Sequence, residues 1–297
     1  MYVNMENIEK MRRGMAAGDA KRDAGLRYPE NVVRCTDISY GPYDCNKLDV
    51  YYPEGTEMPL PTIVSIHGGG WIYGSKELYS HYCTRLALRG FTVVNFDYRL
   101  SPENKYPAPL EDSCMVLHWM QQHAKDYYID LKNVFTVGDS AGGQIEYQLL
   151  TMLTNPDYAA LFDFAPPADF RVNACALNCG CYFIPLSRFV SPKMIGDNFT
   201  AYFEENYMPV VEQLRARKYI DSSFPPAIVM SAAHDFLKFM AAPMYRILRR
   251  KGVESVLKIY GEKGQKEFGH VFHVNCYLES AAKCNDEQCA FFKAHIR

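Results

Sequence analysis

Apolar, strand-like runs alternate with helical patterns along most of the chain, and this alternation constrains the fold more than any other feature. It begins with two strand-like runs, at residues 32–40 and 47–52, joined by a turn around Gly41 and Pro42. Further strands are expected at 62–66, 91–96, 134–137, 171–177, 227–231 and 254–260, and helices at 77–88, 110–123, 141–153, 241–251 and 286–295. Strands that alternate with helices pair in parallel, because each helix carries the chain back across the sheet. We therefore predict an α/β fold with a mostly parallel central sheet flanked by helices.

Two segments do not follow the alternation. Residues 1–31 have at best an amphipathic helical pattern, and residues 181–224 hold many aromatic side chains: Tyr182, Phe183, Phe189, Phe199, Tyr202, Phe203 and Tyr207. Connections this long inside a compact domain are uncommon unless they form lids or binding elements. We therefore expect a cap made by an N-terminal segment at 1–31 and an insertion at about 181–224, on a main domain at 32–297. An aromatic patch that only closes part of the core remains the alternative.

The charge balance and the cysteine content limit the partners and the compartment. Acidic residues number 34 and basic residues 32, with no basic block to neutralise phosphates, so no nucleic-acid partner is expected. No apolar run reaches the ~18 residues of a membrane-spanning helix, and residues 1–14 lack the apolar core of a secretory signal. The ten cysteines are spread along the chain without short paired spacings, which is typical of reduced thiols. We expect a cytoplasmic protein without membrane insertion, and a homo-oligomer remains open.

Residues 138–142 read G-D-S-A-G and lie between an expected strand and an expected helix. This is the setting of a nucleophile elbow, in which a serine occupies a sharp turn with its hydroxyl exposed. Small flanking residues are needed because the neighbouring backbone approaches the turn closely. The sequence therefore predicts Ser140 as a nucleophile.

Residues 67–70 read H-G-G-G, directly after the expected strand at 62–66. Consecutive glycines expose backbone N–H groups that can point at the oxygen of a tetrahedral intermediate. The N–H of Ala141, at the positive end of its helix, offers a further donor. We predict an oxyanion hole formed by Gly69, Gly70 and Ala141. A phosphate-binding loop is disfavoured, since neither a G-x-G-x-x-G pattern nor a P-loop lysine follows.

Three motifs carry a resemblance to a known family: H-G-G-G-W at 67–71, D-Y-R-L-S-P-E at 97–103 and G-D-S-A-G-G at 138–143. From about residue 32 to its C-terminus, the chain resembles the hormone-sensitive-lipase-like family of α/β-hydrolase carboxylesterases. The resemblance implies the α/β-hydrolase fold, a Ser, Asp, His triad, a glycine oxyanion hole, and a cap built from the N-terminal segment and an internal insertion. It implies no metal or organic cofactor. Many members look as if they carry asparagine where this chain has Gln144, which by its position would border the acyl pocket.

The other members of the triad are expected downstream of the serine, the acid first and then the histidine. Asp235 follows the expected strand at 227–231 and resembles the family's D-x-L element, although an aspartate there could also be a helix N-cap. His270 follows the last expected strand, and G-H-V-F at 269–272 resembles the family's catalytic histidine element. His273, in the same loop, is the rival. We predict that Asp235 orients the imidazole and that His270 is the general base.

Cys175, Cys179 and Cys181 alternate along an expected strand and invite interpretation as a metal site. No fourth ligand follows at zinc-finger spacing, so we interpret the three residues as small, buried, apolar side chains. The sequence therefore predicts neither a metal site nor a cofactor site.

These features together predict a serine carboxylesterase that transfers the acyl group of a small-molecule ester to Ser140 and then to water. The aromatic insertion favours short-chain or aryl esters over long-chain triglycerides. Alternative functions that would use the same catalytic residues are those of a carbohydrate acetyl esterase, a feruloyl esterase and an arylformamidase. The alternative of another class is a non-catalytic small-molecule receptor, since some proteins that resemble this family have lost the histidine.

Overall fold

The protein is built around one eight-stranded sheet. A computed structural model describes residues 3–183, 192–203 and 210–297. The strands lie in the order β1-β2-β4-β3-β5-β6-β7-β8, in which β2 is antiparallel to both of its neighbours and all other pairs are parallel. They are β1 (Val32–Ser39), β2 (Lys47–Pro53), β3 (Leu60–Ile66), β4 (Thr92–Phe96), β5 (Ile129–Asp139), β6 (Ala174–Asn178), β7 (Ala227–Ala232) and β8 (Ser255–Tyr260). The predicted α/β fold with a mostly parallel sheet is confirmed.

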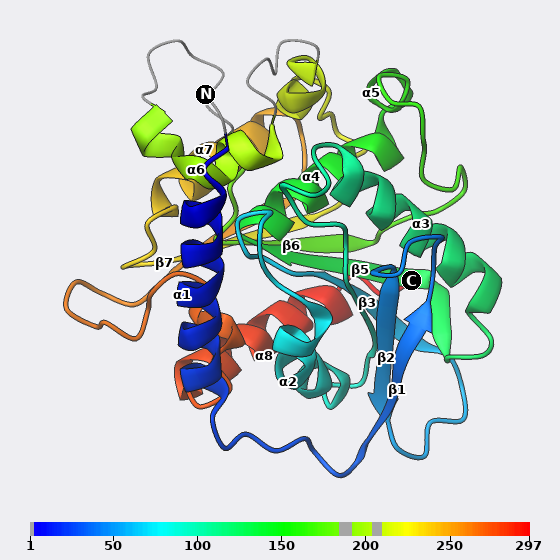
Figure 1. Ribbon diagram of the computed structural model, residues 1–297. Coiled ribbons are helices and arrows are strands. Elements are labelled where there is room, and N and C mark those ends of the chain that lie inside the picture. The colour runs from blue at the N-terminus through cyan, green and yellow to red at the C-terminus, as the bar shows by residue number, and fades with distance from the viewer. Residues whose placement is uncertain (1–2, 184–191, 204–209) are drawn as a thin grey trace.

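Helices cover both faces of this sheet (Figure 1). They are α1 (Met5–Asp23), α2 (Lys76–Ala87), α3 (Ala108–His123), α4 (Ala141–Thr154), α5 (Pro156–Ala159), α6 (Pro192–Tyr202), α7 (Lys238–Arg250) and α8 (Glu279–Lys293), with short 3-10 turns η2 (Gln213–Lys218) and η3 (Phe272–Val274). α3, α4 and α7 pack on one face, and α2 and α8 pack on the other. None of the helices that the structure describes is long and apolar enough to cross a membrane.

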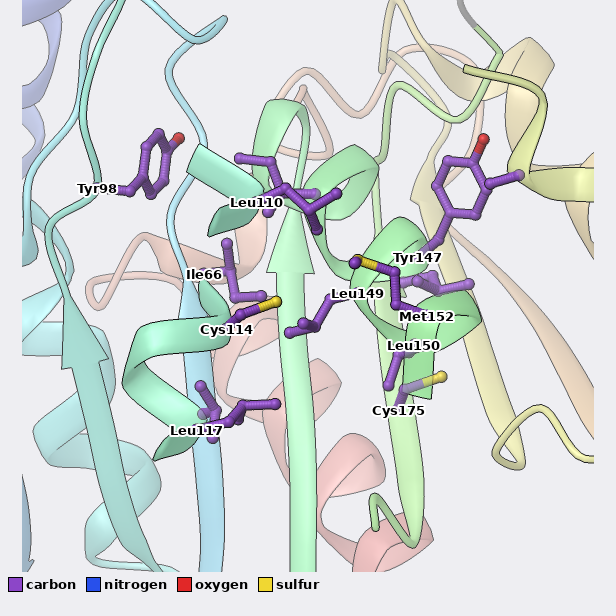
Figure 2. Packing of buried hydrophobic residues seen from close by; sticks show 14 of the residues in the cluster. Ile66, Tyr98, Leu110, Cys114, Leu117, Tyr147, Leu149, Leu150, Met152 and Cys175 are labelled. Atoms are coloured by element: carbon purple, nitrogen blue, oxygen red, sulfur yellow. The ribbon is translucent and has the colours of Figure 1, made fainter. Parts of the chain in front are cut away.

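The side chains of each strand alternate between two core layers, as the pleat of a strand requires. In β3, Val64 and Ile66 join the layer that contains α3 and α4, whereas Ile63 belongs to the layer that contains α2. Figure 2 shows part of the first layer, including Leu117 of α3 and Leu149 of α4. The nearly continuous apolar run of β3 is therefore explained by burial on both faces.

The C-terminal helix starts earlier than its sequence pattern indicates. The pattern predicts a helix at 286–295, whereas α8 spans Glu279–Lys293. The first turns of α8 bury only small or polar side chains, namely Ala281, Cys284 and Asn285, so no apolar stripe marks them. The prediction of this helix was right in type and wrong in its start.

α1 lies beside α6 and against the loop that follows β3 (Figure 1). Ile8 is buried against Ile72 and Ala201. The Arg12 guanidinium donates to the backbone carbonyls of Ile72 and Ser101, at 2.8 Å each. These contacts attach α1 to the loops that follow β3 and β4.

Only part of the expected insertion at 181–224 belongs to the described residues. α6 and η2 fall within it. Phe189 and Tyr207, two of the aromatic residues named for this insertion, lie outside the described residues.

Candidate active site

Four loops bring polar side chains together at the carboxyl ends of the parallel strands. His67 follows β3, Ser140 follows β5, Asp235 follows β7, and His270 lies in the loop after β8. Because parallel strands end at one edge of the sheet, residues far apart in sequence meet there. This edge is where ligands bind in open α/β sheets.

Ser140 occupies a strained turn between β5 and α4. Its backbone has φ 53° and ψ −115°, a conformation that residues other than glycine rarely adopt. The turn is tight because Gly142 passes close to the end of β3, where a β-carbon on Gly142 would lie 2.1 Å from the carbonyl oxygen of Ile66. Only glycine fits at this position. The serine lines a cavity, which is the geometry of a nucleophile elbow.

Ser140, His270 and Asp235 form one chain of hydrogen bonds. The Nε2 atom of His270 lies 3.0 Å from Ser140 Oγ, and its Nδ1 atom lies 2.6 Å from Asp235 Oδ1. Asp235 is fixed by two further groups. The Ser231 hydroxyl donates to its Oδ2 at 2.6 Å, and the Leu237 N–H donates to its Oδ1 at 2.8 Å. This carboxylate favours the imidazole tautomer with Nδ1 protonated and Nε2 free to accept from the serine.

Burial and pairing set the charges around this chain of hydrogen bonds. Burial raises the pKa of Asp235, but the hydrogen bond and the charge of His270 outweigh burial, so the pKa lies below its usual value. Asp235 is therefore ionised at neutral pH. His273, the rival histidine, packs against Tyr82, and its Nδ1 atom has no partner among the described residues. Burial lowers the pKa of His273 to about 3, which keeps that ring neutral.

The glycine loop after β3 presents backbone N–H groups to the same cavity. Gly69 has φ 121°, and a β-carbon on it would lie 1.9 Å from the carbonyl oxygen of Tyr73, so the loop needs glycine there. Gly69, Gly70 and Ala141 line the cavity together with Ser140. Within the described part of the chain, the structure gives no acceptor to the N–H groups of these three residues. Three donors are therefore available to an oxygen bound beside the serine.

Tyr79 connects the glycine loop to the serine turn through hydrogen bonds. Its hydroxyl donates to Asp139 Oδ2 at 2.8 Å and accepts from the Gly68 N–H at 3.0 Å. Burial raises the pKa of Asp139 to about 7, although the Tyr79 hydrogen bond acts in the opposite direction. His67 stacks on Tyr98 and contacts the Gly68 carbonyl. Burial lowers the pKa of His67 to about 4, so this ring stays neutral and supports the loop.

A cavity of about 1180 Å³ opens over Ser140. Its lining is largely apolar and aromatic: Met11, Met15, Trp71, Phe183, Phe199, Phe236, Phe239 and Met240. Two of these side chains come from α1, and two come from the segment at 181–224. The ring of Phe236 lies 4.2 Å from the ring of His270. The segments at 1–31 and 181–224, which do not follow the alternation of strands and helices, therefore form part of the wall of the cavity.

Gln144 does not border this cavity. Its side chain is 1% exposed, and its Oε1 atom accepts the indole N–H of Trp71 at 2.9 Å. The expectation that this residue borders an acyl pocket is therefore wrong, because its amide is used inside the protein to hold Trp71.

One group of described side chains has metal-binding chemistry. The Sγ atom of Cys179 and the ligand atoms of Asp235 and His270 lie within 4.8 Å of one another. Asp235 and His270 are already hydrogen-bonded to each other. Burial raises the pKa of the Cys179 thiol well above its usual value, whereas a metal ligand has to be a thiolate. The group therefore fits a hydrogen-bonded triad better than a metal centre.

Two supporting residues of the site were missed by sequence reasoning. Tyr79 lies on α2 and Ser231 lies in the apolar strand β7, and neither belongs to a recognisable motif. Their contacts depend on where the glycine loop and Asp235 come to lie after folding. A serine within an apolar strand, four residues before Asp235, was the only available signal.

Comparisons with known structures agree with this architecture. A family model described as alpha/beta hydrolase fold matches residues 63–273. Esterase B from Lactobacillus rhamnosis overlaps with a TM-score of 0.89 at 24% identity, over 98% of this chain and 94% of that chain. An esterase from Pyrobaculum calidifontis overlaps with a TM-score of 0.78 at 24% identity, over 97% of this chain and 93% of that chain. These two likenesses show the fold.

Two curated proteins are similar in sequence over shorter segments. The versiconal hemiacetal acetate esterase of Dothistroma septosporum is 34% identical over 150 residues, which is 50% of this chain and 44% of that protein. The carboxylesterase NlhH of Mycobacterium tuberculosis is 38% identical over 118 residues, which is 39% of this chain and 37% of that protein. The chain thus spans less than half the length of each of these relatives.

Proposed function

The chain belongs to the hormone-sensitive-lipase-like family of α/β hydrolases, and on that premise we propose that it hydrolyses carboxylic esters through an acyl-enzyme intermediate. The observation that carries the proposal is the hydrogen-bonded chain from Ser140 through His270 to Asp235, with distances of 3.0 and 2.6 Å. The names of the two curated relatives, an acetate esterase and a carboxylesterase, support it.

The proposed reaction has two steps. Ser140 attacks the ester carbonyl while His270 Nε2 takes its proton, and Asp235 stabilises the imidazolium that forms. His270 then gives the proton to the leaving alcohol, and the acyl group remains on the serine as an ester. In the second step water attacks this ester with His270 again as the base, and the carboxylic acid is released.

The N–H groups of Gly69, Gly70 and Ala141 are proposed to bind the oxyanion of both tetrahedral intermediates. Ala141 is the first residue of α4, so its N–H lies at the positive end of the helix dipole. Donors that are fixed before the charge develops stabilise it strongly, and the loss of one such donor typically lowers kcat by about 10²–10³. In the proposed steps these N–H groups stabilise the negative charge on the carbonyl oxygen, and no cofactor is used.

Short-chain or aryl esters are the proposed substrates. The rings of Phe183, Phe199, Phe236 and Phe239 line the cavity and can stack on an aromatic acyl or alcohol group. We further propose that the segments at 1–31 and 181–224 form a cap on a catalytic domain at 32–297. Helices α1 and α6 both contribute residues to the lining of the cavity over Ser140, which agrees with this cap.

The cytoplasm is the proposed compartment. All ten cysteines are free thiols. Reduced thiols are typical of a reducing compartment. A small-molecule ester is the only partner that the proposed reaction requires besides water.

A substrate panel tests this function. It comprises nitrophenyl esters of increasing acyl length, acetylated sugars, feruloyl esters and N-formyl aromatic compounds. We expect the highest kcat/KM for the short or aryl esters, and Ser140→Ala should lower turnover by roughly 10⁴–10⁶. A preference for long acyl chains would overturn the substrate class, and full activity of the Ser140→Ala variant would overturn the mechanism. Binding of these compounds without any turnover would indicate the receptor alternative.

A further inference from the structure

Trp71 adopts a backbone conformation that bulky residues avoid. Its φ is 65°, and it follows Gly69 and Gly70, whose φ values are 121° and 60°. Three successive residues with positive φ turn the chain sharply where it passes the serine. For a tryptophan this conformation is a genuine outlier. It persists only where the surrounding structure holds the residue in several ways at once.

Three separate contacts hold Trp71 in this conformation. Its indole N–H donates to Gln144 Oε1 at 2.9 Å. Its indole ring stacks on the ring of Tyr202, with centroids 4.9 Å apart and an angle of 9° between the planes. Its carbonyl oxygen accepts the Ser101 N–H at 2.8 Å. The indole also meets the ring of Phe203 edge-on, with centroids 6.0 Å apart, and the bond to Gln144 is the one hydrogen bond that its ring makes among the described residues.

The amide of Gln144 is itself fixed in orientation. Its NH₂ group donates to the amide oxygen of Gln148, so its oxygen faces the indole N–H, which can only donate. Gln148 in turn donates to the Tyr158 hydroxyl at 2.8 Å and to the Gln213 carbonyl at 3.0 Å, within η2. All of these side-chain groups are buried or partly buried, so each lost bond leaves an unpaired polar group. An asparagine at position 144 is shorter by one C–C bond, about 1.5 Å, and could not make both contacts.

We propose that Gln144 is a positioning residue for the oxyanion hole. By holding the indole of Trp71, it keeps the strained backbone of the loop in place, and so it fixes the directions of the Gly69 and Gly70 N–H groups. Through Gln148 the same network connects the loop to η2, in the segment proposed as part of the cap. This inference rests on the proposed ester hydrolysis, because the oxyanion hole takes its role from the tetrahedral intermediates of that reaction.

A double-mutant cycle tests the proposal. Gln144→Met keeps the length of the side chain and removes the acceptor, and Trp71→Phe removes the donor and keeps a ring against Tyr202. We expect each single variant to lower kcat about tenfold or more and to change KM less than about threefold. This loss of kcat is smaller than the loss seen when an oxyanion donor is removed outright, because the donors remain but are less well oriented. The affinity for a trifluoromethyl ketone, which mimics the tetrahedral intermediate, should fall by the same factor as kcat/KM. The double variant should be no worse than the poorer single variant, because both singles break one bond.

A rescue variant distinguishes a positioning role of Gln144 from a general contribution of Gln144 to the stability of the fold. In Gln144→Glu, the protonated carboxyl offers the same acceptor and donor as the amide. Burial raises the pKa of such a group. Once ionised, the carboxylate still accepts from Trp71 but can no longer donate to Gln148, so we expect activity relative to wild type to be highest at low pH and to fall as this second bond is lost. The change of this ratio with pH is followed in one folded variant, so it decides the question even if Gln144→Met does not fold.

Asn173→Leu is the matched control, since Asn173 is also a buried amide and lies just before β6, at the amino ends of the parallel strands, whereas Ser140 lies at their carboxyl ends. It should lower the melting temperature and leave kcat and the affinity for the ketone within about twofold of wild type. Additive losses in the cycle, or a Gln144→Met variant that loses stability but keeps kcat, would overturn the positioning role. If the wild-type protein hydrolyses no ester at all, the proposed function itself fails. That result differs from the two results that would overturn only the positioning role.

Discussion

A β-carbon on Gly142 would lie 2.1 Å from the carbonyl oxygen of Ile66, so the start of α4 touches the end of β3 with no room for a side chain. This contact fixes the serine turn against the glycine loop. Gly142→Ala should therefore force the two backbones apart and destabilise the protein by about 1–3 kcal/mol or more. Urea unfolding measures the free energy, and an ester assay measures the accompanying loss of turnover.

Gly14 and Gly18 on α1 provide the matched control for this substitution. A β-carbon on either residue meets nothing within 4 Å. Alanine there should be neutral or should stabilise the protein by up to about 1 kcal/mol, because glycine disfavours a helix. Equal effects at Gly142 and Gly14 would contradict the steric account.

Asp235→Asn should lower kcat by roughly 10⁴ with little change in stability. The asparagine can turn an NH₂ group toward His270 Nδ1, which favours the tautomer that carries its proton on Nε2. That ring cannot accept the Ser140 proton. Steady-state kinetics and a melting curve check the two parts of the prediction, and a loss below tenfold would show that the carboxylate does not orient the ring.

Tyr79→Phe should loosen the glycine loop. The substitution leaves the Gly68 N–H and the Asp139 carboxyl without their shared partner. Each unpaired buried group costs about 1–3 kcal/mol, so we expect the free energy of unfolding to fall by about 2–4 kcal/mol, with reduced kcat. Tyr82→Phe, on the same helix, is the control, because Tyr82 accepts only a longer bond of 3.3 Å from Gln288. A larger loss for Tyr82→Phe would contradict the assignment.

His273→Phe should remove one source of acid sensitivity. The pKa of His273 is about 3 in the fold, against 6.5 for an ordinary histidine, so the unfolded chain binds one more proton between these values. Wild type should therefore lose about 2 kcal/mol relative to the variant between pH 6.5 and 5, and the difference should be constant above pH 7. Urea unfolding at several pH values measures it. A pH-independent difference would show that His273 is not held neutral by burial.

The parts of the site that lie within one short segment could be predicted from the sequence. The G-D-S-A-G turn places its serine between β5 and α4 because the turn and the start of the helix are local structures. The alternation of strands and helices likewise predicts the parallel sheet, since its cause is local periodicity.

The parts that depend on side-chain direction after folding could not be predicted. His270 and His273 follow the same strand, and the left-handed turn at Val271, with φ 52°, and the start of η3 lie between a ring that faces Ser140 and a ring buried against Tyr82. Gln144 follows the serine by one helical turn, which gave no sign that its amide reaches Trp71. In both cases contacts between distant segments decide the outcome.

The central claim is that His270 and Asp235 activate the hydroxyl of Ser140, and a fluorophosphonate probe tests it most directly, because only an activated serine reacts with it quickly. The labelled protein is digested, and the modified peptide is identified by mass spectrometry. We predict rapid labelling of native wild type at Ser140 alone, much slower labelling of Asp235→Asn, and no labelling of Ser140→Ala or of heat-unfolded protein. An unlabelled native wild type, or a label carried by another residue, would contradict the account.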